Sequence, residues 1–227
     1  MNSAASKPQL IVQRVGRGLL LEPLRMLADG IAGVDEIDQI IRRLGGFRAG
    51  PFERMDAVGL GIDYALTRGV WEQLGQPARL EPHPLQAELI ERGHLGRSSG
   101  RGFYVYDREP PLPAVSVDRK SFDCPPGVYK AVRRFVDGAA AEGGSFTEHY
   151  VFARTLVAVI NEAALCVDEN LASEHEIDTA MTGDAGYPRG PLEWAAKIGR
   201  HTCATLLRRF NERVDDNRFR PGSWLGT

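Results

Sequence analysis

The sequence is poor in cysteine and in net charge, and each shortage excludes a class of protein. Its three cysteines are scattered and form no C-x-x-C pair, which argues against a disulfide framework, a zinc site or a dithiol redox motif. A formal net charge of −2 gives no basis for binding nucleic acid. The five histidines show no metal-ligand spacing. We expect a cytoplasmic protein with no bound metal and no nucleic-acid partner.

Long apolar runs and nucleotide-binding glycines are also missing. The most apolar stretch, residues 150–167, contains two charged side chains and an asparagine, so we interpret it as a buried helix and expect no membrane partner. The N-terminus, MNSAASKPQ, lacks the apolar core of a signal peptide. The glycines of Gly59-Leu60-Gly61 are followed by no third glycine of a G-x-G-x-x-G motif, and no strand–helix alternation surrounds them. We therefore expect no dinucleotide site in this chain alone.

The chain does contain an internal repeat with an offset of 140 residues. Between residues 14–59 and 154–199, 11 of 46 positions are identical, whereas composition alone predicts about three. The identities include Gly50-Pro51, which falls on Gly190-Pro191. Chance similarity between amphipathic helices does not readily explain matched glycine–proline pairs. We infer two copies of one supersecondary unit.

Each copy predicts the same series of helices. A long apolar helix is expected first, over residues 9–29 and 148–169, ended by Gly30 and Asn170 in the left-handed conformation. A capping box then opens the second helix, with Ser173 and Glu176 in one copy and Gly33 and Glu36 in the other. Further helices are expected to begin at Pro51 and Pro191, near Gly61 and Arg200, and at Pro84, with another over residues 128–141. The glycine- and proline-rich residues 96–126 predict at most short extended pieces.

Several motifs resemble the helical domain of bacterial 3-hydroxyacyl-CoA dehydrogenases. In the first copy they are P-Q-L-I-V-Q-R-V (residues 8–15), D-G-I-A-x-V-x-x-I-D (29–38), G-G-F-x-x-G-P-F-E (45–53), V-G-L-x-x-D (58–63) and L-G-R-S-S-G-R-G-F-Y (95–104). The second copy has N-E-A (161–163) and G-Y-P-R-G-P-L-E (186–193). The resemblance implies an all-α fold of two tandem 3-hydroxyacyl-CoA dehydrogenase C-terminal-type helical modules (6-phosphogluconate dehydrogenase C-terminal-like) that form a pseudo-dimer. We expect the modules over residues 8–106 and 127–213, a linker over 107–126 and a tail over 214–227.

The resemblance also implies candidate site residues. Family enzymes use NAD, held by a Rossmann domain, and a His–Glu pair to convert 3-hydroxyacyl-CoA to 3-oxoacyl-CoA in fatty-acid or related acyl-CoA metabolism. The one catalytic group of the helical domain is an asparagine, and Gln13 stands at its position. Phe47, Arg48, Ala49 and Phe52 fall in the segment that contributes to the substrate pocket. The chain carries neither the Rossmann motif nor a recognisable His–Glu pair.

Three functions remain open at this point. The chain is the substrate-binding and dimerisation part of a dehydrogenase, a non-catalytic scaffold that binds acyl-CoA or a protein, or a structural helical dimer without a ligand. The intact start of the first helix, residues 8–14, favours the first function, with NAD bound by a separate domain or subunit. The altered Gln13, Arg48 and Ala49 favour the second. We expect a monomer, as a pseudo-dimer, or a weak homodimer.

Arginines lie on otherwise apolar helices in both copies, at Arg14 and Arg154. Such a side chain could bind a phosphate or carboxylate group of a ligand. More often it pairs internally, and the partners in reach of the pattern are Glu22, Glu53 and their repeat mates. We expect an internal ion pair.

Overall fold

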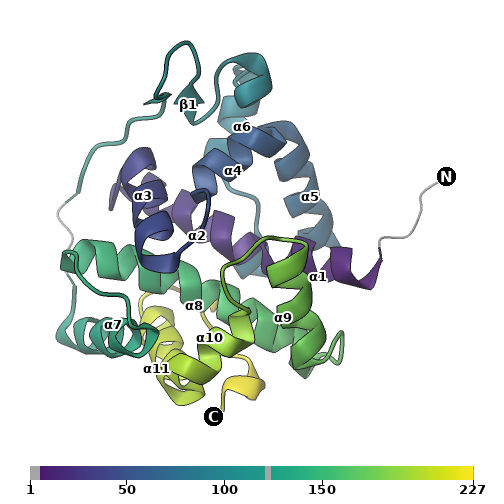
Figure 1. Ribbon diagram of the computed structural model, residues 1–227, viewed down its shortest axis with the longest axis vertical. Helices are drawn as coiled ribbons and strands as arrows, with labels where there is room; N and C mark the ends of the chain where they lie inside the picture. Colours follow the sequence, from purple (N-terminus) through teal and green to yellow (C-terminus); the bar gives the residue numbers. More distant parts are fainter. Residues whose placement is uncertain (1–5, 121–123, 227) are drawn as a thin grey trace. The chain divides into compact units, whose positions relative to one another are not determined.

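Residues 6–120 and 124–226 are described by the computed structural model of the protein, and they are mainly helical (Figure 1). The helices of the first repeat copy and its surroundings are α1 (Lys7–Val15), α2 (Arg17–Ala28), α3 (Val34–Gly45), α4 (Pro51–Val58), α5 (Leu60–Gln73), η1 (Ala78–Leu80), α6 (Pro84–Glu91) and η2 (Arg97–Ser99). Those of the second are α7 (Pro126–Ala139), α8 (Phe146–Asp168), α9 (Glu174–Gly183), α10 (Pro191–Ile198), α11 (Arg200–Asn211) and η3 (Ser223–Leu225). The predicted all-α class is confirmed.

One short antiparallel ladder interrupts the helices. It pairs β1 (Tyr104–Val105) with β2 (Leu112–Pro113), with Tyr104 opposite Pro113. No other paired strands occur within residues 6–120 and 124–226. The expectation of short extended pieces in the glycine- and proline-rich segment is confirmed.

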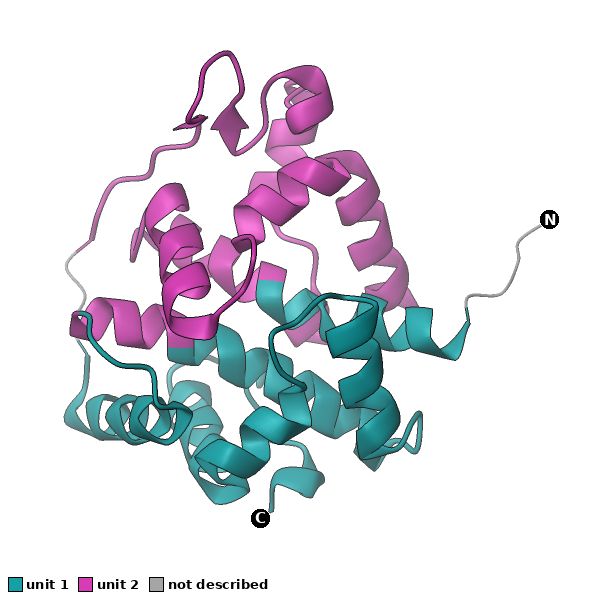
Figure 2. Cartoon of the chain, in the orientation of Figure 1, with its two compact units in different colours: residues 1–19, 124–144, 153–227 teal, residues 20–123, 145–152 magenta. Residues whose placement is uncertain are grey.

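The chain divides into two compact units (Figure 2). Unit 1 contains residues 1–19, 124–144 and 153–227, and unit 2 contains residues 20–123 and 145–152. The expected modules were defined by the sequence repeat, and their boundaries differ in kind from those of the compact units. The modules and the pseudo-dimer therefore stay predictions. Residues 121–123 of the expected linker and Thr227 of the expected tail lie outside the described residues.

The helix boundaries follow the signals in the sequence. Asn170 has a φ of 56° and Gly30 a φ of 73°, so both adopt the expected left-handed conformation after the long apolar helices. The Glu176 carboxylate accepts a hydrogen bond from the Ser173 N–H at 2.8 Å, and the Ser173 hydroxyl accepts one from the Glu176 N–H at 3.3 Å, which confirms the capping box. In the first copy, Gly33 has no side chain to complete the box, and only the Glu36 carboxylate bonds back, at 3.3 Å.

The long first helix differs from its prediction. The expected single helix over residues 9–29 is divided into α1 and α2 at Gly16. The break is one residue long. The Gly16 N–H still donates to the Val12 carbonyl at 3.0 Å, as in a continuous helix. Glycine is a weak helix former, which fits an interruption at this position. The second copy has Leu156 in the corresponding place, and α8 is continuous.

Helix α8 is long and apolar enough to cross a membrane by length and composition alone, but 83% of its most apolar 18-residue window is buried inside the protein. Burial of this kind is typical of a core helix. Nine of its residues show no exposure at all: Val151, Phe152, Ala153, Val157, Val159, Ile160, Ala163, Ala164 and Cys166. The interpretation as a buried helix is confirmed for the described residues.

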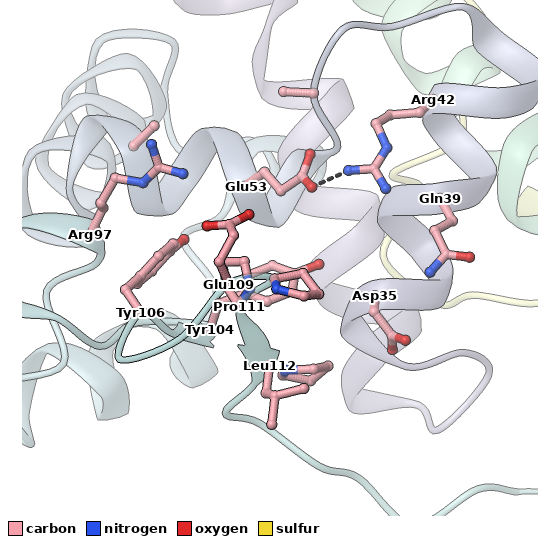
Figure 3. Close-up of a pocket in the computed structure, with 14 residues that line it drawn as sticks. Asp35, Gln39, Arg42, Glu53, Arg97, Tyr104, Tyr106, Glu109, Pro111 and Leu112 are labelled. Carbon is pink, nitrogen blue, oxygen red and sulfur yellow. Dashed lines mark hydrogen bonds and ion pairs between the residues drawn. The ribbon is translucent and has the colours of Figure 1, made fainter.

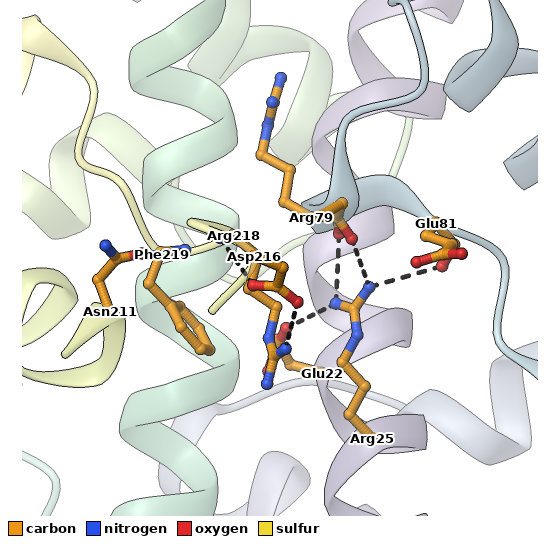
Figure 4. Close-up of polar contacts among 9 residues, drawn as sticks. Glu22, Arg25, Arg79, Glu81, Asn211, Asp216, Arg218 and Phe219 are labelled. Carbon is orange, nitrogen blue, oxygen red and sulfur yellow. Dashed lines mark hydrogen bonds and ion pairs between the residues drawn. The ribbon is translucent and has the colours of Figure 1, made fainter. Parts of the chain in front are cut away.

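Unit 2 is stabilised by a part-buried arginine network on α2 (Figure 4). Arg25 donates to the Glu22 carboxylate at 2.6 Å and to the main-chain carbonyls of Ala78 at 3.0 Å and Arg79 at 3.2 Å. Glu22 itself is 3% exposed. The guanidinium therefore ties the short helix η1 to α2, and Glu22 serves as a buried hydrogen-bond acceptor in this unit.

Candidate functional site

The turn that carries four of the candidate residues is held by a buried carboxylate. Asp38 of α3 accepts hydrogen bonds from the Phe52 N–H at 2.9 Å, the Glu53 N–H at 3.0 Å and the Tyr104 hydroxyl at 2.8 Å. Two of these donors are free N–H groups in the first turn of α4, where the helix dipole favours a negative charge. A Cβ atom on Gly50 would lie 2.2 Å from Asp38 Cγ, so this position requires glycine. The motif therefore clamps α4 onto α3.

The second copy repeats this clamp. Asp178 accepts hydrogen bonds from the Leu192 N–H at 2.8 Å and the Glu193 N–H at 3.0 Å. A Cβ atom on Gly190 would again lie 2.2 Å from the carboxylate carbon. The repeated Asp and Gly-Pro positions thus have one structural explanation in both units.

An ion pair between Glu53 and Arg42 lies beside the clamp. Glu53 accepts a hydrogen bond from the Gly50 N–H at 2.7 Å and forms an ion pair with Arg42. Burial raises the pKa of Asp38 to about 7, although its hydrogen bonds from Phe52 and Tyr104 oppose the shift. Burial beside this carboxylate also raises the pKa of Tyr104, so the phenol stays protonated and donates.

A second buried carboxylate fixes the glycine-rich loop. Asp56 accepts hydrogen bonds from the Phe103 N–H at 2.9 Å, the Tyr104 N–H at 3.0 Å and the Tyr106 hydroxyl at 2.9 Å. A Cβ atom on Gly102 would lie 2.1 Å from its Oδ1 atom. The G-R-G-F-Y loop therefore packs around the Asp56 carboxylate and donates backbone hydrogen bonds to it. The internal repeat gives no signal for Asp56, because the second copy has Ala196 in its place and no glycine-rich loop of this kind.

The candidate substrate residues separate into core and surface positions. Phe52 has no exposed surface and packs against Phe103 with ring centroids 4.7 Å apart, while Phe47 is 5% exposed. Arg48 is exposed and Ala49 is half-buried. Their role in binding a substrate remains a prediction.

Ala49 lines a cavity of about 650 Å³ in unit 2 (Figure 3). Its charged and aromatic walls include Asp35, Arg42, Glu53, Arg97, Tyr104, Tyr106 and Glu109, and residues 110–113 close one side. The guanidinium of Arg97 lies 5.2 Å from the ring centroid of Tyr106. Three carboxylates against two guanidinium groups make this a site of mixed charge. It has no excess of positive charge to attract the phosphates of a CoA ester.

Gln13 lies in unit 1, on α1, and is half-buried. Its main-chain carbonyl accepts a hydrogen bond from Arg17 Nε at 3.0 Å. Its side-chain amide takes part in no hydrogen bond within the described ranges. The corresponding residue of the second copy, Ala153, is fully buried, so that copy presents no polar group at this position.

The neighbouring Arg14 anchors α1. It donates to Glu162 at 2.6 Å, and it binds Glu169 through two hydrogen bonds of 2.5 and 2.8 Å. Burial opposes the charge of Arg14, but the hydrogen bond to Glu169 and the charge of Glu162 outweigh it and raise its pKa. Glu162 is the repeat mate of Glu22, so the predicted internal ion pair is confirmed for Arg14. A cavity of about 370 Å³ lies farther along α1, between Lys7 and α9.

The described residues do not build a site for NAD. A dinucleotide is usually held on a glycine-rich turn between a parallel strand and a helix. The strands within residues 6–120 and 124–226 form one two-residue antiparallel pair, and the glycines of Gly59-Leu60-Gly61 lie at a helix start.

Comparison with known protein families shows which family this chain belongs to. The family described as "3-hydroxyacyl-CoA dehydrogenase, C-terminal domain" matches residues 10–106 and 150–227. The chain belongs to this family. Each matched stretch contains one repeat copy, including its Asp38 or Asp178 clamp.

The proteins most usefully compared with this chain are longer than it is. The chain is 29% identical to the 3-hydroxyadipyl-CoA dehydrogenase of Escherichia coli K12, with 97% of this chain and 59% of that protein covered. It is 27% identical to the human peroxisomal bifunctional enzyme, with 84% of this chain and 27% of that protein covered. The crystal structure of 3-hydroxybutyryl-CoA dehydrogenase from E. coli is similar with a TM-score of 0.78 and 28% identity, over 96% of this chain and 59% of that one. The chain thus spans about three fifths, or less, of these relatives.

Proposed function

We propose that this chain is the substrate-binding and dimerisation part of a 3-hydroxyacyl-CoA dehydrogenase. In the complete enzyme, a 3-hydroxyacyl-CoA is oxidised to a 3-oxoacyl-CoA while NAD accepts the hydride. Hydride transfer requires a nicotinamide held against the substrate carbon and a positioned acid or base. In this proposal a separate domain or subunit supplies both, and the chain is not competent alone. Membership of the dehydrogenase family supports the proposal.

The observation that carries the proposal is the position of the half-buried Gln13 amide on α1. The adjacent Arg14 holds α1 in place through its ion pairs to Glu162 and Glu169. The half-buried Gln13 amide makes no hydrogen bond within the described part of the chain, so its N–H is available to a ligand. An N–H donor at this position stabilises negative charge on the thioester or keto oxygen of an acyl-CoA.

The candidate residues of unit 2 take two roles in this proposal. Phe47 and Phe52 fix the shape of the turn through burial, and Arg48 and Ala49 contact the substrate. The acyl-CoA phosphates are bound outside the mixed-charge cavity, since that cavity lacks a surplus of cations. We propose a cytoplasmic protein that is a monomer or weak homodimer. Sedimentation as a tight dimer at all concentrations would contradict this oligomeric state.

A non-catalytic scaffold that binds acyl-CoA or a protein is the second candidate. The replacement of asparagine by Gln13 favours it, because the extra methylene moves the amide by about 1.5 Å, and catalytic geometry tolerates little displacement. A scaffold would bind its ligand without any dependence on this amide.

Calorimetric titration of acetoacetyl-CoA into Gln13 variants separates the two candidates. Loss of one neutral hydrogen bond costs about 0.5–1.5 kcal/mol, so Gln13→Ala should weaken binding by about twofold to tenfold. Gln13→Asn should retain binding, and the exposed Gln73→Ala is the matched control. Equal affinity in all four proteins would favour the scaffold.

A further inference from the structure

The two repeat copies differ in what covers their third and fourth helices. In unit 1, α7 lies across α10 and α11. A Cβ atom on Gly138 would be 3.0 Å from Ile198 Cα, and Lys197 Nζ donates to the Ala139 carbonyl at 3.1 Å. At the other end of α7, the Cβ position of Gly127 lies 3.7 Å from Arg209 Nε. Helix α7 therefore runs antiparallel to α11, from Arg209 to Ile198.

Helix α7 is amphipathic and is built for this position. Its buried residues are Val128, Ala131, Val132, Phe135, Val136 and Ala139. Its exposed side includes Lys130, Arg133 and Arg134, so the helix has one apolar and one basic face. Under this helix, Ile198 is 7% exposed and Thr202 is 8% exposed.

Within residues 6–120 and 124–226, no helix covers the equivalent face of unit 2 as α7 covers unit 1. The offset of 140 residues places Val58 on Ile198 and Ile62 on Thr202, and these side chains are 49% and 61% exposed. Apart from the backbone of its own helix and its chain neighbours, no atom lies within 4 Å of the Cβ position of Gly69, the equivalent of Arg209. Leu66 is half-buried, whereas its counterpart Leu206 has no exposure. We call Val58, Ile62, Leu66 and Gly69 the α5 ridge.

Packing elsewhere in unit 2 does not take the place of α7. Helix α6 reaches α5 on a different side, where Gln86 Nε2 donates to the Leu60 carbonyl at 3.2 Å and to Asp63 at 3.0 Å. The Leu95 carbonyl accepts from the Leu60 N–H at 3.0 Å, and Leu95 itself is 40% exposed beside the ridge. The apolar surface of the ridge is therefore extended rather than closed by its neighbours.

We propose that the α5 ridge is a docking site for an amphipathic α-helix of another polypeptide, bound antiparallel to α5 as α7 is to α11. The bound helix carries a valine and phenylalanine stripe like that of α7, with a small residue where it crosses Val58. The small Gly69 leaves room for a larger residue at the other end. An interface of this kind uses helix-in-groove recognition, with anchors at spacings of three and four residues. The inference does not depend on acyl-CoA binding.

A labelled peptide with the α7 sequence, PGVYKAVRRFVDGA, tests the proposal against the full chain by fluorescence anisotropy. The chain's own α7 occupies the equivalent site in unit 1, so added peptide should bind the free ridge. We expect saturable one-to-one binding in the range of tens of micromolar, since a 14-residue helix must fold as it binds. Ile62→Asp should raise the Kd at least tenfold, while Leu112→Asp, at a 46% exposed apolar residue elsewhere in unit 2, should leave it unchanged.

Three results would overturn the proposal. One is a lack of saturation at about 1 mM peptide. Another is binding that Ile62→Asp does not weaken, which would indicate exchange with α7 itself. The third is a dimer of the full chain that Ile62→Asp dissociates, which would assign the ridge to a second copy. Equal melting temperatures for the Ile62→Asp and Leu112→Asp proteins would show that neither substitution acts by unfolding the chain.

Discussion

Replacement of the buried carboxylate in the α3–α4 clamp should strongly destabilise unit 2. Asp38→Ala removes the acceptor for two backbone N–H groups and for the Tyr104 hydroxyl, at 2.8–3.0 Å. Because burial disfavours the charged form of Asp38, each of its three hydrogen bonds is counted as neutral, at about 0.5–1.5 kcal/mol, and loss of a helix cap costs about 1 kcal/mol. Burial of the carboxylate offsets part of this gain. We expect a net loss of about 3–5 kcal/mol, against a typical total stability of 5–15 kcal/mol.

The second repeat copy provides the matched comparison. Asp178 accepts only the two backbone hydrogen bonds and is half-buried, so Asp178→Ala should cost about 2 kcal/mol. Tyr104→Phe leaves the Asp38 clamp on α4 intact and should cost about 1 kcal/mol.

Urea denaturation followed by circular dichroism measures these differences. The free energy of unfolding should fall in the order Tyr104→Phe, Asp178→Ala, Asp38→Ala, with two transitions where the units unfold separately. A loss below about 1 kcal/mol for Asp38→Ala would refute the reasoning, because a buried carboxylate with three donors cannot be removed without an effect. Equal losses for the two aspartates would show that Tyr104 and burial add nothing.

Three further changes are expected to alter stability in urea denaturation. Arg14→Ala removes the cation that pairs with the buried Glu162 carboxylate and should cost about 3–5 kcal/mol, whereas Arg14→Met with Glu162→Met should cost less; equal costs would contradict the pairing. Gly102→Ala places a Cβ atom 2.1 Å from Asp56 and should cost more than 1 kcal/mol, while an unchanged midpoint would contradict the fit. The pKa of Asp38 is raised from 3.8 to about 7, so its contribution to stability is present below pH 3.8 and is lost as the pH rises toward 7. Asp38→Asn should flatten the pH profile over that interval, and an equal slope would refute the assignment.

Local signals in the sequence account for most of the helix boundaries. Proline at Pro51, glycine at Gly30 and the pair of Ser173 and Glu176 each act within a few residues, so their effects can be predicted without the tertiary structure. The break at Gly16 was not predicted, because the apolar pattern continues through it. An interruption of one residue barely disturbs that pattern.

Roles that depend on contacts between residues far apart in the chain could not be predicted from the sequence. Arg14 and Glu162 are 148 residues apart, and the repeat offered several possible partners. The role of Asp56 depends on a loop more than 40 residues away that has no counterpart in the second copy. The family resemblance predicted a place for Phe52 in the substrate pocket, whereas its complete burial against Phe103 depends on packing. Spacing in a sequence does not fix such contacts.

Calorimetric titration of the unmodified chain with acetoacetyl-CoA, with NADH titrated in parallel, tests the central claim most directly. A substrate-binding part of a dehydrogenase should bind acetoacetyl-CoA at micromolar concentrations and show no binding of NADH. Free CoA should bind more weakly than its acetoacetyl ester, because the ester supplies the oxygen that the Gln13 amide contacts. Absence of heat from acetoacetyl-CoA, with a folded chain by circular dichroism, would contradict the claim and leave the protein-binding scaffold as the function.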